Sequence, residues 1–503
     1  MRLKQVKSSL HLALVAFLFI LMSSCTEKKV EQVDLNPLKV TELQPIQRDW
    51  DTIKKSKSLR MITRYNSISY FLHNGVEKGF EYDFLKSFAK ENDLTLEIII
   101  AQENENLIDL LNSGVGDIIA ANYAVNNERK QYHDYSEHYN LVNQVIIFNQ
   151  DNIDSTGIAN GSQDITIAVR NNSSYYSTLQ NLKKQGLATN LTIVEVDSDT
   201  ETLLNAVANN EFEATIADDN IFKAASAYVQ GLGTGPAISK SDSVAWGIRK
   251  NAPQLKVKLN KFVKQHYRID DEGVEKRSAF LNILIERYFE NHRRIFAQKS
   301  AIFETKYTGV LSPFDKLIKP LADSAGIDWK MVVSIAAQES RFDPDAKSWA
   351  GAVGLLQINH RFSKYSEDEL LDPEVNIKEA IRILTEHLNH YKYLDEENKW
   401  ALVLATYNAG VGHVSDARRI VMDSYKDPNN WDFVEAALLK LMKREHFANA
   451  RYGYCRGIET VNYVRDVMKR RDMYETILSI ASAENKLKNK ANNSLLAFAE
   501  TTH

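Results

Sequence analysis

The pattern of apolar residues changes once along this chain, near residue 300, and the change separates two fold classes. Between residues 58 and 120, short apolar runs alternate with helix-length patterns. We expect strands at 59–63, 94–100 and 117–120, and helices at 82–91 and 108–112. Strands that alternate with helices predict βαβ units. From about Thr305 only helical periodicity remains, which predicts helices at 313–325, 329–340, 375–391, 399–407, 431–443 and 458–478. The sequence therefore predicts a multidomain protein, with an α/β domain over 55–290 followed by an all-α domain over 300–480.

The two ends of the chain have compositions unlike either domain. Arg2, Lys4 and Lys7 precede an apolar run over 10–22, which is too short to cross a bilayer comfortably, and Cys25 follows two serines. This order resembles a bacterial lipoprotein signal. The resemblance implies a signal peptide over 1–24, lipidation of Cys25, and anchoring on the periplasmic side of the outer membrane. A plain secretory signal is the alternative. Residues 25–54 are polar and predict a tether, and residues 485–503 form a polar tail in which we expect partial disorder.

Composition indicates a folded protein and argues against a general nucleic-acid binder. The chain has 503 residues, a hydrophobic content of 44%, a charged content of 25% and a net charge of −4, so it is expected to fold and is not a general nucleic-acid binder. If Cys25 carries lipid, the second cysteine, Cys455, has no partner for a disulfide within one chain and is expected to be buried. We expect no cofactor. For His387 and His390, a solvated helix face is favoured over a metal site.

Glu339 is a candidate general acid. Asp328 is a plausible N-cap for the helix that begins at Trp329, and Val332, Ile335 and Glu339 follow on one face. Burial and the negative end of the helix dipole both disfavour the ionised carboxylate there. A carboxyl that stays protonated near neutral pH can donate a proton in catalysis. Spacing alone equally allows a Glu that is salt-bridged or points to water.

Four ordered motifs place Glu339 in a known context. They are Glu339-Ser340, Ser348 with GAVGLLQ at 351–357, ATYNAG at 405–410, and ETVNYV at 459–464. Together they resemble the soluble lytic transglycosylase domain, which is related to goose-type lysozyme. The resemblance implies a lysozyme-like fold, Glu339 as catalytic acid and peptidoglycan glycan strands as substrate. The glycan-binding residues that it implies are Ser340, Ser348, Gln357, Tyr407, Asn408, Glu459 and Tyr463. Leu356 and His360 depart from the residues most frequent in that domain.

A single catalytic carboxyl constrains the chemistry. Most glycosidases use two carboxylates, whereas the motif supplies one. One acid suffices if the N-acetyl group of the substrate stabilises the developing cation and Glu339, once ionised, takes a proton from the C6 hydroxyl. This reaction leaves a 1,6-anhydro product and makes the protein a peptidoglycan lytic transglycosylase. The alternatives are a hydrolytic muramidase and a non-catalytic sensor of cell wall or solute.

The α/β domain carries a second set of motifs. They are GFEYD at 79–83, LLNSG at 110–114 with Asp117, and Glu128-Arg129. They resemble the family 3 extracellular solute-binding proteins, and imply two lobes, the second at about 150–243. Arg129 would bind a ligand α-carboxylate and Asp218 an α-ammonium. Ala124 and Asn126 replace hydroxyl residues common in that family, so the class of ligand remains open. The domain could bind an amino acid or a muropeptide, or it could be a degenerate lobe kept only for docking.

The two modules in this order resemble the membrane-bound murein lytic transglycosylase F family. Because a hinge between two lobes can act as a switch, we hypothesise that ligand binding to the first module modulates the second. Measurement of the lytic rate with and without such ligands tests this.

Overall fold

The computed structural model describes residues 45–102, 105–153, 164–171, 173–187, 190–239, 241–295, 305 and 308–500, with side chains up to residue 482. The expected signal peptide, Cys25 and residues 25–44 of the tether lie outside these ranges. All described residues belong to one of the two compact units of the chain, Val40–His503. None of the described helices combines the length and apolarity needed to span a bilayer.

A five-stranded sheet forms the first lobe of the α/β domain, in the order β4-β1-β5-β14-β6. β1 pairs in parallel with β4 and β5, whereas β14 pairs antiparallel with β5 and β6. The strands are β1 (Ser58–Thr63), β4 (Thr95–Ile100), β5 (Ile118–Ile119), β6 (Asp134–Tyr135) and β14 (Gly247–Ile248). The helices are α2 (Trp50–Ser56), α3 (Phe80–Glu91), α4 (Leu107–Asn112), α9 (Pro253–His266) and α10 (Ala279–Ile285), with the short turns η1 (Arg129–Gln131) and η2 (Glu286–Glu290). Two hairpins complete this part, β2 (Phe71–His73) with β3 (Val76–Lys78) and β15 (Tyr267–Ile269) with β16 (Glu275–Arg277).

The core of this lobe follows from the spacing of aromatic residues. Phe80, Phe84 and Phe88 lie at i, i+4 and i+8 on α3, so they share one helix face, and all three are buried. Asp117 is buried as well, and its carboxylate pairs with Arg60 at 2.8 Å and Arg249 at 2.9 Å. Because buried charges need partners, this cluster fixes the start of β5 beside β1.

A second five-stranded sheet forms the other lobe, in the order β10-β9-β11-β8-β12. Its strands are β8 (Gln144–Asn149), β9 (Ile165–Arg170), β10 (Leu191–Val196), β11 (Ala214–Asp218) and β12 (Leu232–Ala237), and its helices are α6 (Ser174–Lys184), α7 (Thr200–Ala208) and α8 (Asp219–Ala225). Two paired antiparallel strands, β7 (Asn140–Val142) and β13 (Asp242–Val244), lie where the chain leaves and re-enters the first lobe. The second lobe starts earlier than the expected boundary near 150. The reason is that β8 is buried at all six residues and lies inside the second sheet.

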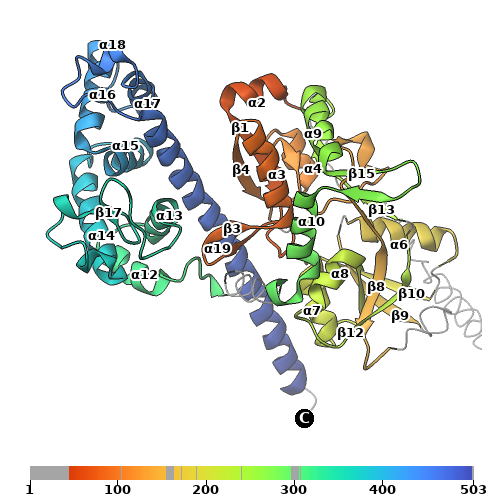
Figure 1. Ribbon diagram of the computed structural model, residues 1–503. Helices are drawn as coiled ribbons and strands as arrows, with labels where there is room; N and C mark the ends of the chain where they lie inside the picture. The colour runs from red at the N-terminus through yellow and green to blue at the C-terminus, as the bar shows by residue number, and fades with distance from the viewer. Residues whose placement is uncertain are drawn as a thin grey trace, which may run out of the picture. The chain divides into compact units, whose positions relative to one another are not determined.

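The second domain is helical, and in Figure 1 it occupies the teal-to-blue part of the colour range. Its helices are α12 (Asp315–Ser324), α13 (Trp329–Glu339), α14 (Pro373–His390), α15 (Glu396–Ala409), α16 (Val411–Asp423), α17 (Trp431–Lys440), α18 (Arg444–Phe447) and α19 (Gly457–Glu500), with the short turns η3 (His360–Phe362) and η4 (Glu369–Leu371). α13 packs on α12 and α19, and α15 packs on α14, α16 and α19. The predicted order, a two-lobed α/β domain followed by a helical domain, is confirmed.

Three details differ from the sequence predictions. A two-stranded hairpin, β17 (Ala352–Val353) with β18 (Ile358–Asn359), interrupts the helices, where no strand was expected. The pattern gave no indication of α16. The backbone of α19 is helical through Glu500, where a partly disordered tail was expected from residue 485.

Candidate active site

Glu339 is the last residue of α13. The Asp328 side chain caps the start of this helix by accepting a bond from the Lys330 amide at 3.1 Å, and Met331 to Ala337 are all buried. The helix ends because Arg341 and Phe342 adopt φ values of 55° and 66°, in the left-handed region. The Glu339 carboxyl is therefore held at the end of a buried helix, where the chain turns away.

The carboxyl of Glu339 meets a buried tyrosine from α19. The Tyr463 hydroxyl donates to Glu339 Oε1 at 2.7 Å, and Tyr463 is 5% exposed. The pKa of Glu339 is raised from the ordinary value of 4.5 to about 7. Burial is the main cause, the hydrogen bond from Tyr463 opposes it, and the charge of Glu459 adds to it. Near neutral pH this carboxyl is thus divided between its protonated and ionised forms.

Two expected glycan-binding residues use their hydroxyl protons to hold the loop that follows Glu339. Ser340 donates to the Leu355 carbonyl at 2.7 Å. Tyr407 donates to the next carbonyl, Leu356, also at 2.7 Å. Burial, followed by the charge of Glu339, raises the pKa of Tyr407 well above its ordinary value, so this phenol remains neutral. These hydroxyls shape the wall beside Glu339, and only their lone pairs are left to accept a bond from a ligand.

Gln357 also stabilises the loop that follows Glu339. Its amide nitrogen donates to the carbonyls of Ala346 and Gly354, both at 3.0 Å. Gly354 has φ 80°, and a Cβ there would lie 2.4 Å from the Leu370 carbonyl oxygen. The loop can therefore follow this path only with glycine at that position.

Asn376 also shapes this loop, although none of the sequence motifs includes it. It is fully buried on α14. Its side chain accepts from the Leu356 amide at 2.8 Å and donates to the Val353 carbonyl at 3.0 Å. The sequence did contain one indication of this role, because Asn376 is a polar residue on the otherwise apolar face of the helix predicted over 375–391.

Two other expected residues keep donors for a ligand. Ser348 accepts a bond from the Ala352 amide at 2.9 Å, so its own proton can be donated elsewhere. Asn408 Oδ1 accepts from the Thr460 hydroxyl at 2.8 Å, which fixes the orientation of its amide and leaves the NH₂ group to donate.

Glu459 is exposed, and its carboxylate lies 3.7 Å from Arg456 Nη1. The structure thus brings Glu339, Tyr463 and Glu459 into one electrostatic group.

The basic run Lys469-Arg470-Arg471 on α19 is paired with side chains of the protein. Arg470 Nη1 donates to Gln338 Oε1 at 3.0 Å. Arg471 Nε donates to Asp328 at 2.8 Å, and Lys469 forms an ion pair with Glu97. These partners lie within the protein, so Arg470 and Arg471 hold the two ends of α13 rather than face a glycan strand.

The α/β domain brings its two expected ligand-binding residues to one segment, 122–124. Asp218 ends β11, is 2% exposed, and accepts from Asn122 Nδ2 at 2.9 Å. Its Oδ1 is buried and has no hydrogen-bond partner among the described residues. The Arg129 guanidinium lies 4.5 Å from the centre of the Tyr123 ring and donates to the Ala124 carbonyl at 3.5 Å.

Burial, followed by the charges of Asp242 and Asp219, raises the pKa of Asp218 to about 7, although the hydrogen bond from Asn122 opposes the shift. A cationic group from a ligand would supply the missing partner of Oδ1 and reverse this shift.

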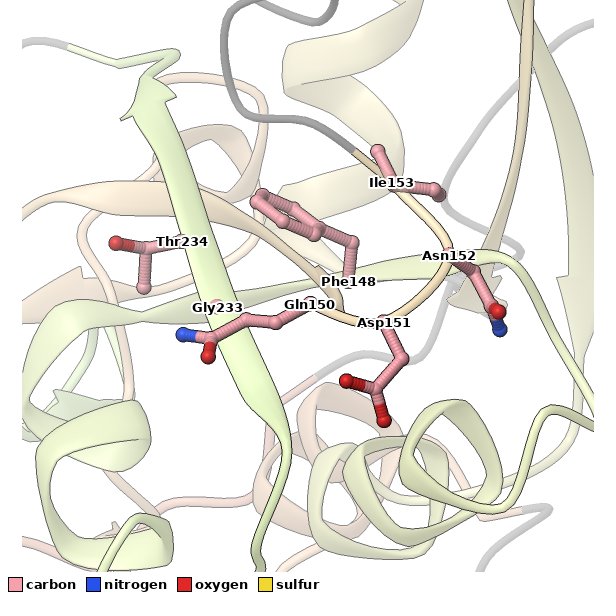
Figure 2. Close-up of a pocket in the computed structure, with 7 residues that line it drawn as sticks. All are labelled: Phe148, Gln150, Asp151, Asn152, Ile153, Gly233 and Thr234. Atoms are coloured by element: carbon pink, nitrogen blue, oxygen red, sulfur yellow. The ribbon is translucent and has the colours of Figure 1, made fainter.

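Other features of the described residues do not join either site. A hollow of about 590 Å³ in the second lobe is lined by Phe148, Gln150, Asp151, Asn152, Ile153, Gly233 and Thr234 (Figure 2), none of which the sequence singled out. Across the part of the chain that is described, no group of three or more His, Cys, Asp or Glu residues could hold a metal ion. Cys455 is buried, as expected.

Family models match parts of both domains. The family model "Transglycosylase SLT domain" matches residues 316–430, and "Bacterial extracellular solute-binding proteins, family 3" matches residues 59–271. The ancestral amino acid-binding protein AncCDT-1, described as a precursor of cyclohexadienyl dehydratase, is a solved structure with 23% identity. It covers 48% of this chain and 98% of its own, with a TM-score of 0.39.

Two relatives match along most of the chain. "Membrane-bound lytic murein transglycosylase F" of Desulfosudis oleivorans is 29% identical over 421 residues, which is 83% of this chain and 89% of the relative. The protein of the same name from Shewanella loihica is 28% identical over 482 residues, or 95% and 94% of the two chains. The chain thus joins a family 3 solute-binding domain to a transglycosylase SLT domain, and is similar over most of its length to membrane-bound lytic murein transglycosylases F.

Proposed function

We propose that this protein is a peptidoglycan lytic transglycosylase. It cleaves the β-1,4 bond between MurNAc and GlcNAc without water and leaves 1,6-anhydro-MurNAc ends. The observation that carries the proposal is the carboxyl of Glu339, which has a pKa of about 7 and is held at the end of α13 by the Tyr463 hydroxyl. The SLT domain match over 316–430 contains this residue.

A pKa near 7 suits a group that must act first as an acid and then as a base. Protonated Glu339 donates its proton to the glycosidic oxygen as the bond to the MurNAc anomeric carbon breaks. The N-acetyl carbonyl of the same sugar stabilises the cation that develops. The ionised Glu339 then takes the proton of the C6 hydroxyl as its oxygen closes on the anomeric carbon. The proton count balances, and the enzyme returns to its starting state.

The nearby carboxyls are engaged in other interactions, which supports a single catalytic acid. Asp343, four residues after Glu339, is exposed and accepts a bond from the Asp345 amide at 3.0 Å. Glu459 lies beside Arg456. Neither has the burial that gives Glu339 its raised pKa.

Digestion of purified sacculi by the wild-type chain and by Glu339→Gln tests the proposal. Mass spectrometry of the soluble products should show anhydro-muropeptides from the wild type and none from Glu339→Gln. Glu367→Gln is the matched control, because it makes the same chemical change at an exposed carboxylate that pairs with Lys347. Muropeptides with reducing ends would identify a hydrolytic muramidase instead. A wild type that releases no product would favour the non-catalytic sensor.

We also propose that an amino acid or muropeptide bound at Asp218 and Arg129 modulates this activity. The buried, unpartnered Oδ1 of Asp218 supports a cationic ligand group there. The β2–β3 hairpin of the α/β domain contacts the segment that follows Glu339. Phe342 lies three residues after Glu339. A Cβ on Gly75 would lie 2.2 Å from the Phe342 ring, so this ring packs directly on the turn of the hairpin. A ligand can bias the active site only if it changes such contacts between two states of the protein.

The lytic rate of the wild type and of Asp218→Asn, with and without amino acids or stem peptides, tests modulation separately from catalysis. We expect a ligand-dependent rate for the wild type and a constant rate for Asp218→Asn. A wild-type rate that does not respond to either class of ligand would reject modulation while leaving the lytic reaction intact.

Anchoring through Cys25 on the periplasmic side of the outer membrane completes the proposal. It is supported by the sequence of residues 1–25, which lie outside the described ranges.

A further inference from the structure

Trp349 lies beside the proposed catalytic site and contributes nothing to the core. Its side chain is 87% exposed, although it is among the largest apolar side chains of the domain. Single exposed apolar residues are common on protein surfaces, so exposure alone assigns no role. The contacts around Trp349 are more informative.

The turn that carries Trp349 is held firmly. The Ser348 amide donates to the Ala352 carbonyl at 2.8 Å, and the Gly351 amide donates to the Ser348 carbonyl at 3.1 Å. On the outer side, Asn359 Nδ2 donates to the Ala350 carbonyl at 3.2 Å. Trp349 thus projects from a short turn fixed on both sides, next to Ser348 of the candidate site.

Arg456 occupies one face of the indole. Its guanidinium carbon lies 5.4 Å from the centre of the Trp349 ring, within the range of a cation–π contact. Arg456 also lies 3.7 Å from the Glu459 carboxylate, whose charge acts on Glu339. Two segments more than a hundred residues apart in sequence, 348–352 and 456–459, therefore meet beside the catalytic carboxyl. Arg456 lies near one face of the indole, and the 87% exposure of Trp349 leaves the ring open to a ligand.

We propose that Trp349, backed by Arg456, is a saccharide-stacking subsite that binds one pyranose ring of the peptidoglycan glycan strand. The apolar C–H face of a pyranose complements the flat face of an indole, and an aromatic ring held in one orientation loses little entropy on binding. The Arg456 side chain, 61% exposed, is positioned for the carboxylates of the lactyl groups or stem peptides of the same strand. This inference rests on the proposed lytic function, because its ligand is the substrate of Glu339.

Binding of soluble, uncross-linked glycan strands to the inactive Glu339→Gln chain provides the test, with the dissociation constant measured by calorimetry. Adding Trp349→Ala should weaken binding by roughly threefold to tenfold, the range typical of aromatic stacking. Trp349→Phe should retain most of the affinity. In the otherwise wild-type enzyme, Trp349→Ala should raise KM by a similar factor and leave kcat nearly unchanged. Since the ring is exposed, the thermal midpoint should not move.

Tyr425→Asn is the matched control. Tyr425 is fully exposed, lies in the segment between α16 and α17, and has φ 55°, which Asn tolerates. Its loss should not change the dissociation constant.

Fluorescence supplies an independent readout. Stacking should shift the emission of the exposed Trp349 to shorter wavelength, and Trp349→Phe should abolish that shift while retaining binding.

Two failures are distinguishable. If Glu339→Gln binds glycan strands and Trp349→Ala binds them equally well, the subsite is overturned and the lytic function stands. If the Glu339→Gln chain binds no glycan and the wild type releases no muropeptide, the proposed function and the subsite fall together.

Discussion

Replacement of Tyr463 by Phe removes the hydroxyl that donates to Glu339 Oε1 at 2.7 Å and keeps the buried ring. A hydrogen bond to a charged acceptor contributes about 1.5 to 3 kcal/mol. The protonated carboxyl also accepts this hydrogen bond, but more weakly. Loss of the Tyr463 hydroxyl therefore destabilises the ionised carboxylate more than the protonated acid. One pKa unit corresponds to about 1.4 kcal/mol. We therefore expect the pKa of Glu339 to rise by about one unit above its value in the wild type.

The lytic rate as a function of pH reports this change. Because protonated Glu339 begins the reaction, kcat/KM falls as pH rises through its pKa in the free enzyme. Tyr463→Phe should move this alkaline limb upward by about one pH unit, measured as release of anhydro-muropeptides from sacculi between about pH 5 and about pH 9. The plateau rate should fall, since the hydroxyl also orients the carboxyl. An alkaline limb that stays in place or moves downward would refute the assigned role of Tyr463.

Tyr407→Phe is the matched control. It also removes a buried phenol hydroxyl beside Glu339, but this one donates to the Leu356 carbonyl rather than to the carboxyl. We expect it to reduce the free energy of unfolding by about 1 kcal/mol, the contribution of one neutral hydrogen bond. The alkaline limb should remain where the wild type has it.

Three further predictions follow, two from the charges of the two sites and one from the expected lipidation of Cys25. Folding raises the pKa of Glu339 from 4.5 to about 7, so the stability associated with this group is present at low pH and is lost as pH rises through 7. Glu339→Gln should therefore raise the free energy of unfolding at about pH 8.5 by up to about 3 kcal/mol and change it little at about pH 4, as measured by urea unfolding; an equal effect at both pH values would contradict this. A cationic ligand that pairs with Asp218, whose pKa is raised to about 7, should release protons on binding near neutral pH. Calorimetry in two buffers of different ionisation enthalpy measures this release, and Asp218→Asn should abolish it. Cys25→Ser should transfer the protein from the membrane fraction to the soluble fraction of cells, and retention in the membrane would exclude lipidation at this residue.

Local sequence was sufficient for the elements whose patterns are strong. Asp328 followed by a repeating apolar face predicted a helix from Trp329, and α13 starts there with the Asp328 cap in place. The alternation of strands and helices before residue 290 likewise predicted the α/β class, because these patterns depend on residues within one or two turns of each other. α16 escaped prediction because only part of one face is buried, at Val414, Asp416, Ala417 and Val421, so its apolar period is weak. The β17–β18 hairpin is too short to show any alternation.

The sequence by itself determined that Glu339 lies at the end of a helix and that Tyr463 and Glu459 belong to another helix, predicted over 458–478. Only the tertiary structure decided what these groups do to one another. Tyr463 is 124 residues from Glu339 in sequence, and its bond to Oε1 exists because α13 packs on α19. The same packing removes water from the carboxyl and raises its pKa. Hydrogen-bond partners and burial depend on elements brought together from distant parts of the chain, so no local pattern could assign the protons of Ser340 and Gln357 to the loop or place Arg456 against Trp349.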